Sequence, residues 1–238
     1  MKKILLIGCG HMGEALLSSW IKSEKYQLNV VDPNRYNFLK KKYKNNKIKI
    51  SKSIVDLEKI NNFYFIIIAV KPIDLNKTLD QLDKITLRDT SIIISVVAGK
   101  KINVFKNKFK KIKNFFRIMP NMPASVGYSM NCIVSNQYSS KTKKNEVINL
   151  FNYSGTSLFL DNEDQIDMAT AISGSGPGFV FNIIDAMENA AIKLGFSKKI
   201  AKILVTQTFK GSIELLLKNN LNAKDLVKIV ATKGGTTE

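Results

Sequence analysis

The hydrophobic positions of this chain form short apolar runs that alternate with stretches of helical spacing over the first two-thirds of the sequence. Two of the runs, 63–70 and 91–97, are apolar at nearly every position, as is typical of parallel strands buried on both faces. Strands are predicted at 3–7, 28–32, 47–50, 63–70, 91–97, 115–119, 130–134 and 157–160. Helices are predicted at 11–23, 36–43 and 141–153, with a brief one after Ser53 and another that begins at Pro72. This alternation predicts an α/β fold with a doubly wound, mostly parallel sheet.

The strand pattern stops at residue 160, and only helical spacing follows it. Helices are predicted at 164–172, 179–194, 197–218 and 223–230. We therefore place a domain boundary near 160–163 and expect two domains, 1–161 and 162–238. The helical domain has few polar positions to present to water, for example over 179–187. Because so small a unit cannot bury this much apolar surface alone, the pattern predicts a homodimer or a higher homo-oligomer. Packing of this surface entirely against the first domain is the less favoured alternative.

The first predicted strand leads directly into a G-x-G-x-x-G turn, and this turn opens a helix. Its residues are Gly8, Cys9, Gly10, His11, Met12 and Gly13. In such a turn the first glycine permits a tight exit from the strand, the second lets a pyrophosphate approach the backbone, and the third allows close helix–strand packing. The free N–H groups and the positive end of the helix dipole then face the phosphates. We expect a Rossmann-like domain in which these six residues bind a dinucleotide.

The end of the second predicted strand gives opposing indications about that cofactor. Asp32 stands close to the spacing at which an acidic residue binds the adenosine ribose diol of NAD(H). Asn34 and Arg35 follow at once, and a guanidinium here could hold the 2′-phosphate of NADP(H) instead. We assign all three residues to the cofactor site and leave both NADP(H) and NAD(H) open.

Two loops follow further strands at the edge where parallel sheets bind ligands. The first contains Ala69, Val70, Lys71 and Pro72. Lys71 could donate a proton, although a loop that shapes the backbone near the cofactor is the favoured interpretation. In the second loop, 120–124, prolines flank Asn121, whose amide could hydrogen-bond a carboxamide or a substrate. Arg117, in the strand before it, could anchor a substrate or form a structural ion pair.

The usual catalytic side chains are scarce. The only histidine, His11, lies in the phosphate turn, where its backbone N–H matters more than its ring. The sequence contains no visible Ser/His/Asp set, carboxylate pair or metal-ligand cluster, so we expect no metal. Two polar, glycine-rich breaks interrupt the helical part: Ser173, Gly174, Ser175, Gly176 and Pro177, and then Gly234, Gly235, Thr236 and Thr237. Backbone N–H groups and hydroxyls in such loops suit a small carboxylate bound without arginine.

The formal net charge of +18 suggests nucleic acid at first sight. Nearly all of it comes from scattered lysines, and the only arginines are Arg35, Arg88 and Arg117. Because guanidinium groups are the preferred readers of phosphates and bases, this scarcity argues against specific nucleic-acid recognition. The longest uncharged apolar run, 61–70, is too short to span a bilayer, so no membrane partner is expected. With no leader pattern and two isolated cysteines, we expect a cytoplasmic protein with reduced thiols.

Taken in order, several segments resemble the pyrroline-5-carboxylate reductase family. They are 7–13 (IGCGHMG), 69–72 (AVKP), 97–99 (VAG), 117–124 (RIMPNMPA), 173–177 (SGSGP) and 233–237 (KGGTT). The resemblance covers essentially the whole chain, and the last two segments are far more specific than the glycine turn. It implies an oxidoreductase that reduces L-1-pyrroline-5-carboxylate to L-proline with NAD(P)H, the final step of proline biosynthesis. It also implies that a helical dimerisation domain follows the Rossmann-like domain.

The resemblance further implies roles for individual residues. In the family, the Ala-Val-Lys-Pro loop and the loop that contains Asn121 line the nicotinamide side, and the Gly-Gly-Thr-Thr loop holds the substrate carboxylate. We therefore predict that Thr237 is the catalytic residue and hydrogen-bonds the imine nitrogen. The residues assigned to the substrate are Ser173, Gly174, Ser175, Gly176, Gly234, Gly235 and Thr236. A cyclic imine is basic enough to be partly protonated near neutral pH, so positioning matters more than a strong acid.

The chain departs from the family pattern at several positions. Thr232 and Lys233 stand where the family commonly has Ser-Pro, and Met122 replaces the usual threonine. The family continues beyond the position of Glu238 with a further helix, which we expect this chain to lack. Two alternatives therefore stay open: a reductase of another small cyclic imino or keto acid, and a truncated, non-catalytic NAD(P)-binding subunit.

Overall fold

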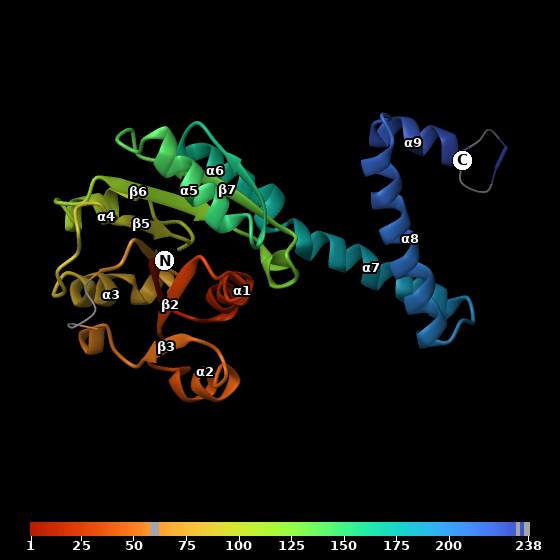
Figure 1. Cartoon of the computed structure of the whole chain (residues 1–238). Helices are drawn as coiled ribbons and strands as arrows, with labels where there is room; N and C mark the ends of the chain where they lie inside the picture. The colour runs from red at the N-terminus through yellow and green to blue at the C-terminus, as the bar shows by residue number, and fades with distance from the viewer. Residues whose placement is uncertain (58–61, 232–233, 236–238) are drawn as a thin grey trace. The chain divides into compact units, whose positions relative to one another are not determined.

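The computed structural model describes residues 1–57, 62–231 and 234–235. Contacts within the chain divide it into two compact units, 1–177 and 178–238. The sheet belongs to the first unit, and the described part of the second unit is helical (Figure 1).

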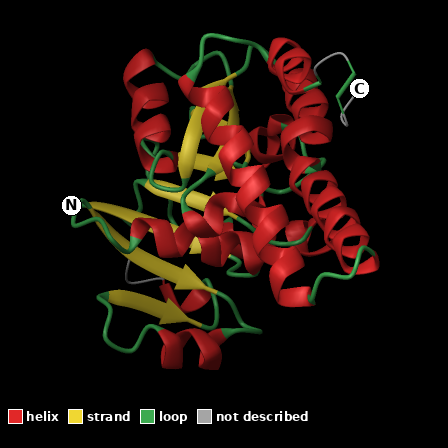
Figure 2. Cartoon of the chain, turned by 90° about the vertical axis from the view of Figure 1, so that its right-hand side faces the viewer, coloured by secondary structure: helices red, strands yellow, loops and turns green. Residues whose placement is uncertain are grey.

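The first unit is built on one eight-stranded sheet with the order β3-β2-β1-β4-β5-β6-β7-β8. Its strands are β1 (Lys2–Ile7), β2 (Tyr26–Val31), β3 (Ile48–Ser51), β4 (Phe65–Ile68), β5 (Ile92–Ser95), β6 (Asn114–Met119), β7 (Ser129–Ser135) and β8 (Gly155–Phe159). All neighbours are parallel except β6 and β7, which pair antiparallel with Met119 opposite Cys132. Figure 2 shows how the strands twist relative to one another. The chain order reverses between β1 and β4, so the carboxyl ends of these two strands are where a doubly wound sheet binds its ligand.

Helices cover both faces of this sheet. They are α1 (His11–Trp20), α2 (Tyr36–Lys42), α3 (Leu75–Leu82), α4 (Ile102–Lys108), α5 (Lys141–Phe151) and α6 (Glu163–Ala169). Shorter turns are the 3₁₀ segments η1 (Val55–Leu57), η2 (Pro72–Asp74) and η3 (Met122–Val126), and the π-helical segment η4 (Thr170–Gly174). One apolar core joins α1, α2 and α5 to the sheet, and a second joins α3, α4 and α6 to it.

Trp20, the last residue of α1, lies in the first core, between α1 and α5. Its side chain is fully buried, and its ring packs edge-on against Phe151 with the centroids 5.8 Å apart. Its Nε1 donates a 2.9 Å hydrogen bond to the carbonyl of Leu150, a partner that a buried indole N–H requires. The contact fixes α1 against α5, and with it the glycine turn at the start of α1.

The predicted fold class of this unit, a doubly wound and mostly parallel sheet, is confirmed. A strand lies within a few residues of every predicted position, and Pro72 begins a 3₁₀ turn that leads into α3. The first helix ends at Trp20 rather than near residue 23, and the brief helix after Ser53 is a 3₁₀ turn. The pattern does not predict α4, because its buried positions, Ile102 and Phe105, lie in a lysine-rich stretch.

Helix α6 packs on the sheet unit although it follows the last strand. Ile166 is fully buried in the second core, and Asp167 pairs with Arg117 of β6 at 2.6 Å. For this reason the compact unit extends to residue 177, whereas the domain boundary predicted after residue 161 marks the end of the strand pattern.

The second unit consists of most of α7 (Gly176–Lys193), together with α8 (Lys198–Lys218) and α9 (Ala223–Val230). Gly195, just after α7, has a φ of +102°, a left-handed conformation that favours glycine. The side chains of Ser197 and Asn222 cap α8 and α9, each accepting a backbone hydrogen bond. Large apolar side chains are exposed along all three helices, among them Phe179, Phe181, Ile183, Met187, Ile200, Ile203, Leu204, Ile213, Val227 and Ile229.

Candidate active site

Two central strands deliver the glycine turn and the Ala-Val-Lys-Pro loop to the same edge of the sheet. Ile7 of β1 and Ile68 of β4 are paired in register, and the amide of Ala69 donates a 2.8 Å hydrogen bond to the carbonyl of Ile7. Gly8 has a φ of +87°, and a Cβ added there would lie 2.6 Å from the carbonyl oxygen of Ala69. Glycine is therefore required at position 8 by the backbone conformation and by this close approach.

At the start of α1, Gly13 packs closely against the glycine turn, whereas the space beside Gly10 is open. A Cβ on Gly13 would lie 2.3 Å from the carbonyl oxygen of Gly8, whereas a Cβ on Gly10 would meet no described atom within 4 Å. The fingerprint places a pyrophosphate beside this second glycine. Among the described residues, no side chain caps the start of α1, so its first N–H groups are available to phosphate oxygens. The turn thus fits a dinucleotide.

Asp32 holds the glycine turn and the loop after β2 together. One carboxylate oxygen accepts a 2.7 Å hydrogen bond from the amide of Cys9. The other accepts from the amides of Asn34 and Arg35 at 3.0 and 2.9 Å. Asp32 is only 7% exposed. Because both oxygens are engaged by the backbone, this carboxylate shapes the adenosine end of the site before any cofactor binds.

The guanidinium of Arg35 is anchored beside the same turn. It donates to the carbonyl of Cys9 and pairs with Glu14 of α1 at 2.6 Å. Lys42 contacts the other carboxylate oxygen of Glu14 at 2.7 Å. Partial burial raises the pKa of Glu14, but the hydrogen bonds from Lys42 and Arg35 outweigh burial and hold this pKa below its ordinary value. The ionised Glu14 therefore fixes the guanidinium in place.

The side chains of Cys9 and His11, in the glycine turn, make fewer contacts in the site than the backbone of the turn does. Cys9 is fully buried, and burial, reinforced by the nearby Glu14 carboxylate, raises the pKa of its thiol to about 12. Its backbone amide and carbonyl bind Asp32 and Arg35, so the residue acts through its backbone. His11, the first residue of α1, is exposed.

Lys71 and Pro72 follow β4 at the same edge of the sheet, and both are exposed. Lys71 has an extended backbone and immediately precedes η2, which begins at Pro72. Both interpretations of this loop, a backbone-shaping element near the cofactor and a proton donor in Lys71, stay predictions.

The loop after β6 reaches two other parts of the site. Asn121, 9% exposed, accepts a 2.9 Å hydrogen bond from the amide of Met130 through its Oδ1. Its Nδ2 donates a 2.8 Å hydrogen bond to the carbonyl of Ser173. The following segment, η3, packs against α1. This loop therefore contacts both the helix that carries the glycine turn and the Ser-Gly-Ser-Gly break.

The Ser-Gly-Ser-Gly break begins in the π-helical turn η4, which ends at Gly174, and it leads into α7, which begins at Gly176. The amide of Ser175 donates a 2.9 Å hydrogen bond to the carbonyl of Thr170, five residues earlier. The hydroxyl of Ser173 donates to the carbonyl of Ala169 at 2.9 Å and lies 3.7 Å from the sulfur of Cys132 in β7. Such turns are rare and occur frequently at functional sites. The predicted substrate residues Ser173 to Gly176 thus lie in the sheet unit.

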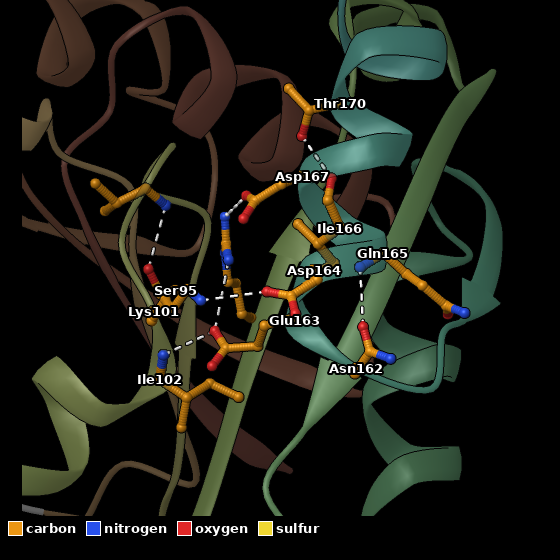
Figure 3. A network of polar contacts seen from close by, with 12 residues as sticks. Ser95, Lys101, Ile102, Asn162, Glu163, Asp164, Gln165, Ile166, Asp167 and Thr170 are labelled. Carbon is orange, nitrogen blue, oxygen red and sulfur yellow. Dashed lines mark hydrogen bonds and ion pairs between the residues drawn. The ribbon is translucent and has the colours of Figure 1, made fainter.

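Arg117 lies beneath α6 and is only 3% exposed. It pairs with Asp167 at 2.6 Å and with Glu163 at 3.5 Å. Figure 3 shows both carboxylates extending from the same side of α6. Glu163 also accepts a 2.9 Å hydrogen bond from the amide of Ile102 at the start of α4. Of the two roles considered for Arg117, the structural ion pair is the one observed, and it fixes the helix that leads into the π-helical turn.

The second glycine-rich break belongs to the helical unit. Gly234 and Gly235 are exposed, and Gly234 has a left-handed φ of +77°. Thr236 and the predicted catalytic residue Thr237 lie outside the described residues, so their roles stay predictions.

Over residues 1–57, 62–231 and 234–235, no group of three or more His, Cys, Asp or Glu side chains is arranged to hold a metal ion. None of the helices in that part of the chain combines the length and apolar character needed to cross a bilayer. The groups that the described site offers to a ligand are backbone N–H donors, amides, hydroxyls and the Arg35 guanidinium.

A glycine turn at the switch point of a doubly wound sheet is typical of dinucleotide-binding proteins of the Rossmann class. Residues 3–99 match the family model described as NADP oxidoreductase, coenzyme F420-dependent. Residues 163–238 match the model described as pyrroline-5-carboxylate reductase dimerisation. The chain belongs to the pyrroline-5-carboxylate reductase family.

The similarity to individual relatives extends over the whole chain. Pyrroline-5-carboxylate reductase 2 of Bacillus subtilis is 32% identical, with all of this chain and 85% of the relative aligned. The reductase of Mycobacterium tuberculosis is 30% identical over all of this chain and 87% of its own length. The crystal structure of the Plasmodium falciparum enzyme with NADP bound superposes with a TM-score of 0.85 at 28% identity, covering 99% of this chain and 86% of that one. The resemblance seen in the sequence motifs is thereby confirmed.

Proposed function

We propose that this protein reduces L-1-pyrroline-5-carboxylate to L-proline with NAD(P)H, the final step of proline biosynthesis. The observation that supports it most is that the glycine turn and the Ser-Gly-Ser-Gly break lie in one compact unit, and that the loop after β6 contacts both this break and α1, the helix that the glycine turn opens. The first suits a dinucleotide and the second suits a small carboxylate. The named relatives carry out the corresponding reaction, and they align with the chain from end to end.

In this proposal the cofactor is held by residues that follow four strands, β1, β2, β4 and β6. They are Gly8, Cys9, Gly10, His11, Met12 and Gly13, then Asp32, Asn34 and Arg35, and finally Ala69, Val70, Lys71, Pro72 and Asn121. When bound, the dinucleotide supplies a hydride to the imine carbon. We favour NADP(H), because Arg35 offers a guanidinium at the adenosine end and both oxygens of Asp32 are already engaged.

Besides the hydride, the reaction needs one proton on the imine nitrogen and a substrate ring that is correctly positioned. Thr237 hydrogen-bonds the nitrogen as the double bond becomes a single C–N bond. As the family resemblance implies, we assign two separate sets of residues to the substrate carboxylate, Ser173, Gly174, Ser175 and Gly176 in the sheet unit and Gly234, Gly235 and Thr236 in the helical unit. Because the cyclic imine already carries part of its proton near neutral pH, these residues contribute mainly by positioning it.

The proposed assembly is a homodimer or a higher homo-oligomer in the cytoplasm. The exposed apolar side chains of α7, α8 and α9 support it, because a surface of this kind calls for a partner. The proposed domain limits, 1–161 and 162–238, place the start of the helical domain next to residue 163, where the dimerisation model begins. The scattered lysines give a weak, salt-sensitive attraction to polyanions and no specific nucleic-acid partner.

Substrate choice and residue roles are tested together. The five-membered imine should be preferred over its six-membered homologue by about tenfold or more in kcat/KM, and over open-chain keto acids by a larger factor. Thr237→Ala should lower kcat and leave NADPH affinity unchanged, whereas Thr237→Ser keeps the hydroxyl and most of the activity. A preference for keto acids would contradict the proposed reaction, and loss of NADPH binding with undiminished turnover per bound cofactor would contradict the role of Thr237.

A further inference from the structure

The carbonyl group of Ser173 lies where the π-helical turn passes into α7. In a regular helix this carbonyl accepts a hydrogen bond from the amide four residues later. That residue is Pro177, which has no N–H. The side chain of Asn121 supplies a donor instead, at 2.8 Å. A loop 52 residues earlier in the chain thus satisfies the break in the helix.

The orientation of the Asn121 amide is fixed by β7. Its Oδ1 accepts a 2.9 Å hydrogen bond from the amide of Met130, so its Nδ2 is the atom that faces Ser173. The backbone amide of Asn121 donates to the hydroxyl of Ser129 at 3.2 Å. With the residue almost completely buried, these bonds hold the side chain in one position.

The π-helical turn has little room to move independently of this support. A Cβ on Gly174 would lie 3.2 Å from the Thr170 side chain and 3.5 Å from the methyl group of Met119, at the end of β6. The Ser173 hydroxyl is already bonded to Ala169. The turn therefore rests on the carboxyl end of β6, and the Asn121 bond sets the position of its carbonyl.

We propose that Asn121 is a positioning residue that acts through Ser173. Its amide couples the loop after β6, which packs against α1, to the turn that is proposed to bind the substrate carboxylate. This inference rests on the proposed function, because hydride transfer needs the cofactor loop and the substrate turn to keep one relative position. Asn121, which the proposed function also places beside the cofactor, then acts mainly on how the imine acid is held and contributes little to the affinity for the cofactor.

Two substitutions and a matched control separate these roles. Asn121→Asp keeps an oxygen for the Met130 amide but offers no N–H to Ser173, whereas Asn121→Ala removes both bonds. Asn136→Ala is the control, because Asn136 bridges the opposite end of the same strand pair. Its Oδ1 accepts from the amide of Phe115 at 3.3 Å, and its Nδ2 donates to the carbonyl of Lys113 at 2.8 Å. Fluorescence of the buried Trp20 reports whether each variant is folded.

Steady-state kinetics with NADPH and pyrroline-5-carboxylate form the first arm. We expect Asn121→Asp to lower kcat/KM for the imine acid at least tenfold and to change the NADPH Kd less than twofold. Asn136→Ala should leave both values within twofold of the wild type. An increased NADPH Kd with unchanged kcat/KM would show that Asn121 acts through cofactor affinity and not through the substrate turn, and would overturn the proposal. Equal losses in both variants, or no loss in Asn121→Asp, would overturn it as well.

Hydrogen exchange of the ligand-free chain forms the second arm and needs no substrate. Asn121→Asp should accelerate exchange over residues 170–178 at least tenfold, and Asn136→Ala should not. Adding Pro177→Ala to Asn121→Asp restores an N–H for the Ser173 carbonyl, so exchange should slow again. Unchanged exchange in Asn121→Asp, or no rescue by Pro177→Ala, would overturn the coupling. The two arms can also disagree. If Asn121→Asp exchanges faster and Pro177→Ala rescues it, the coupling is upheld. If the wild-type chain at the same time does not reduce the imine, the proposed function is rejected.

Discussion

Replacing Asp32 by alanine tests whether this carboxylate shapes the glycine turn or only serves a ribose. It accepts backbone hydrogen bonds from Cys9, Asn34 and Arg35 at 2.7, 3.0 and 2.9 Å. A hydrogen bond to a charged acceptor contributes about 1.5–3 kcal/mol. The amides of Asn34 and Arg35 regain water after the substitution, whereas the buried Cys9 amide stays unpaired. We therefore expect Asp32→Ala to lower the free energy of unfolding by about 3 kcal/mol.

Urea unfolding followed by tryptophan fluorescence measures this loss. Trp20 is the only tryptophan of the chain and is fully buried in the first core, so its signal reports the unit 1–177. Asp56→Ala is the matched control. The carboxylate of Asp56 accepts one exposed backbone hydrogen bond, from Ser53 at 3.0 Å, and its loss should cost about 0.5 kcal/mol.

Dinucleotide titrations of the same variant complete the test. Because the turn itself is loosened, Asp32→Ala should weaken NADH and NADPH binding by similar factors. An aspartate that serves only the ribose diol would leave the urea midpoint unchanged and weaken NADH alone. That pair of results would refute the structural role argued for Asp32.

Three further substitutions address the turn, the ion pairs and the helical unit. Gly13→Ala places a Cβ 2.3 Å from the Gly8 carbonyl oxygen and should lower both the melting temperature and the affinity for NADPH. Gly10→Ala should lower the affinity for NADPH and leave the melting temperature unchanged. Equal shifts of the melting temperature in the two variants would contradict the different roles of the two glycines. Glu14→Gln should lower the free energy of unfolding by about 1 kcal/mol at neutral pH. The pKa of Glu14 is depressed in the folded state, so the wild type exceeds Glu14→Gln in free energy of unfolding by the full amount above pH 4.5 and loses this excess as the pH falls further. An excess that grows in acid would contradict this pH dependence. Phe181→Asp, at a position 53% exposed, should yield monomers in sedimentation velocity with helix content retained, and an unchanged dimer would place the interface elsewhere.

The fold was largely predictable because its signals are local. The apolar runs of β4 and β5 and the glycine turn after β1 each carry their own pattern, so the doubly wound sheet follows from short segments. The helix α4 escaped prediction because its two buried residues are surrounded by lysines, and the attachment of α6 depends on the distant ion pair with Arg117.

The sequence predicted which residues belong to the site, but not the hydrogen bonds and ion pairs that join them. Sequence spacing assigned Asp32 and Arg35 to the cofactor, but the bond from the Cys9 amide to Asp32 and the pairing of Arg35 with Glu14 join residues distant in sequence. The role of Asn121 depends on a contact with Ser173 that no local pattern contains. The one local signal was Pro177, whose position four residues after Ser173 leaves that carbonyl without its usual helical donor.

The proposed reaction is tested most directly by a steady-state assay of L-1-pyrroline-5-carboxylate reduction with NADPH and with NADH. Cofactor oxidation is followed by absorbance, and the product is identified by chiral chromatography. We predict formation of L-proline in equal amount to the cofactor oxidised, with a higher kcat/KM for NADPH than for NADH. Tight binding of both cofactors without formation of proline from either would contradict the account.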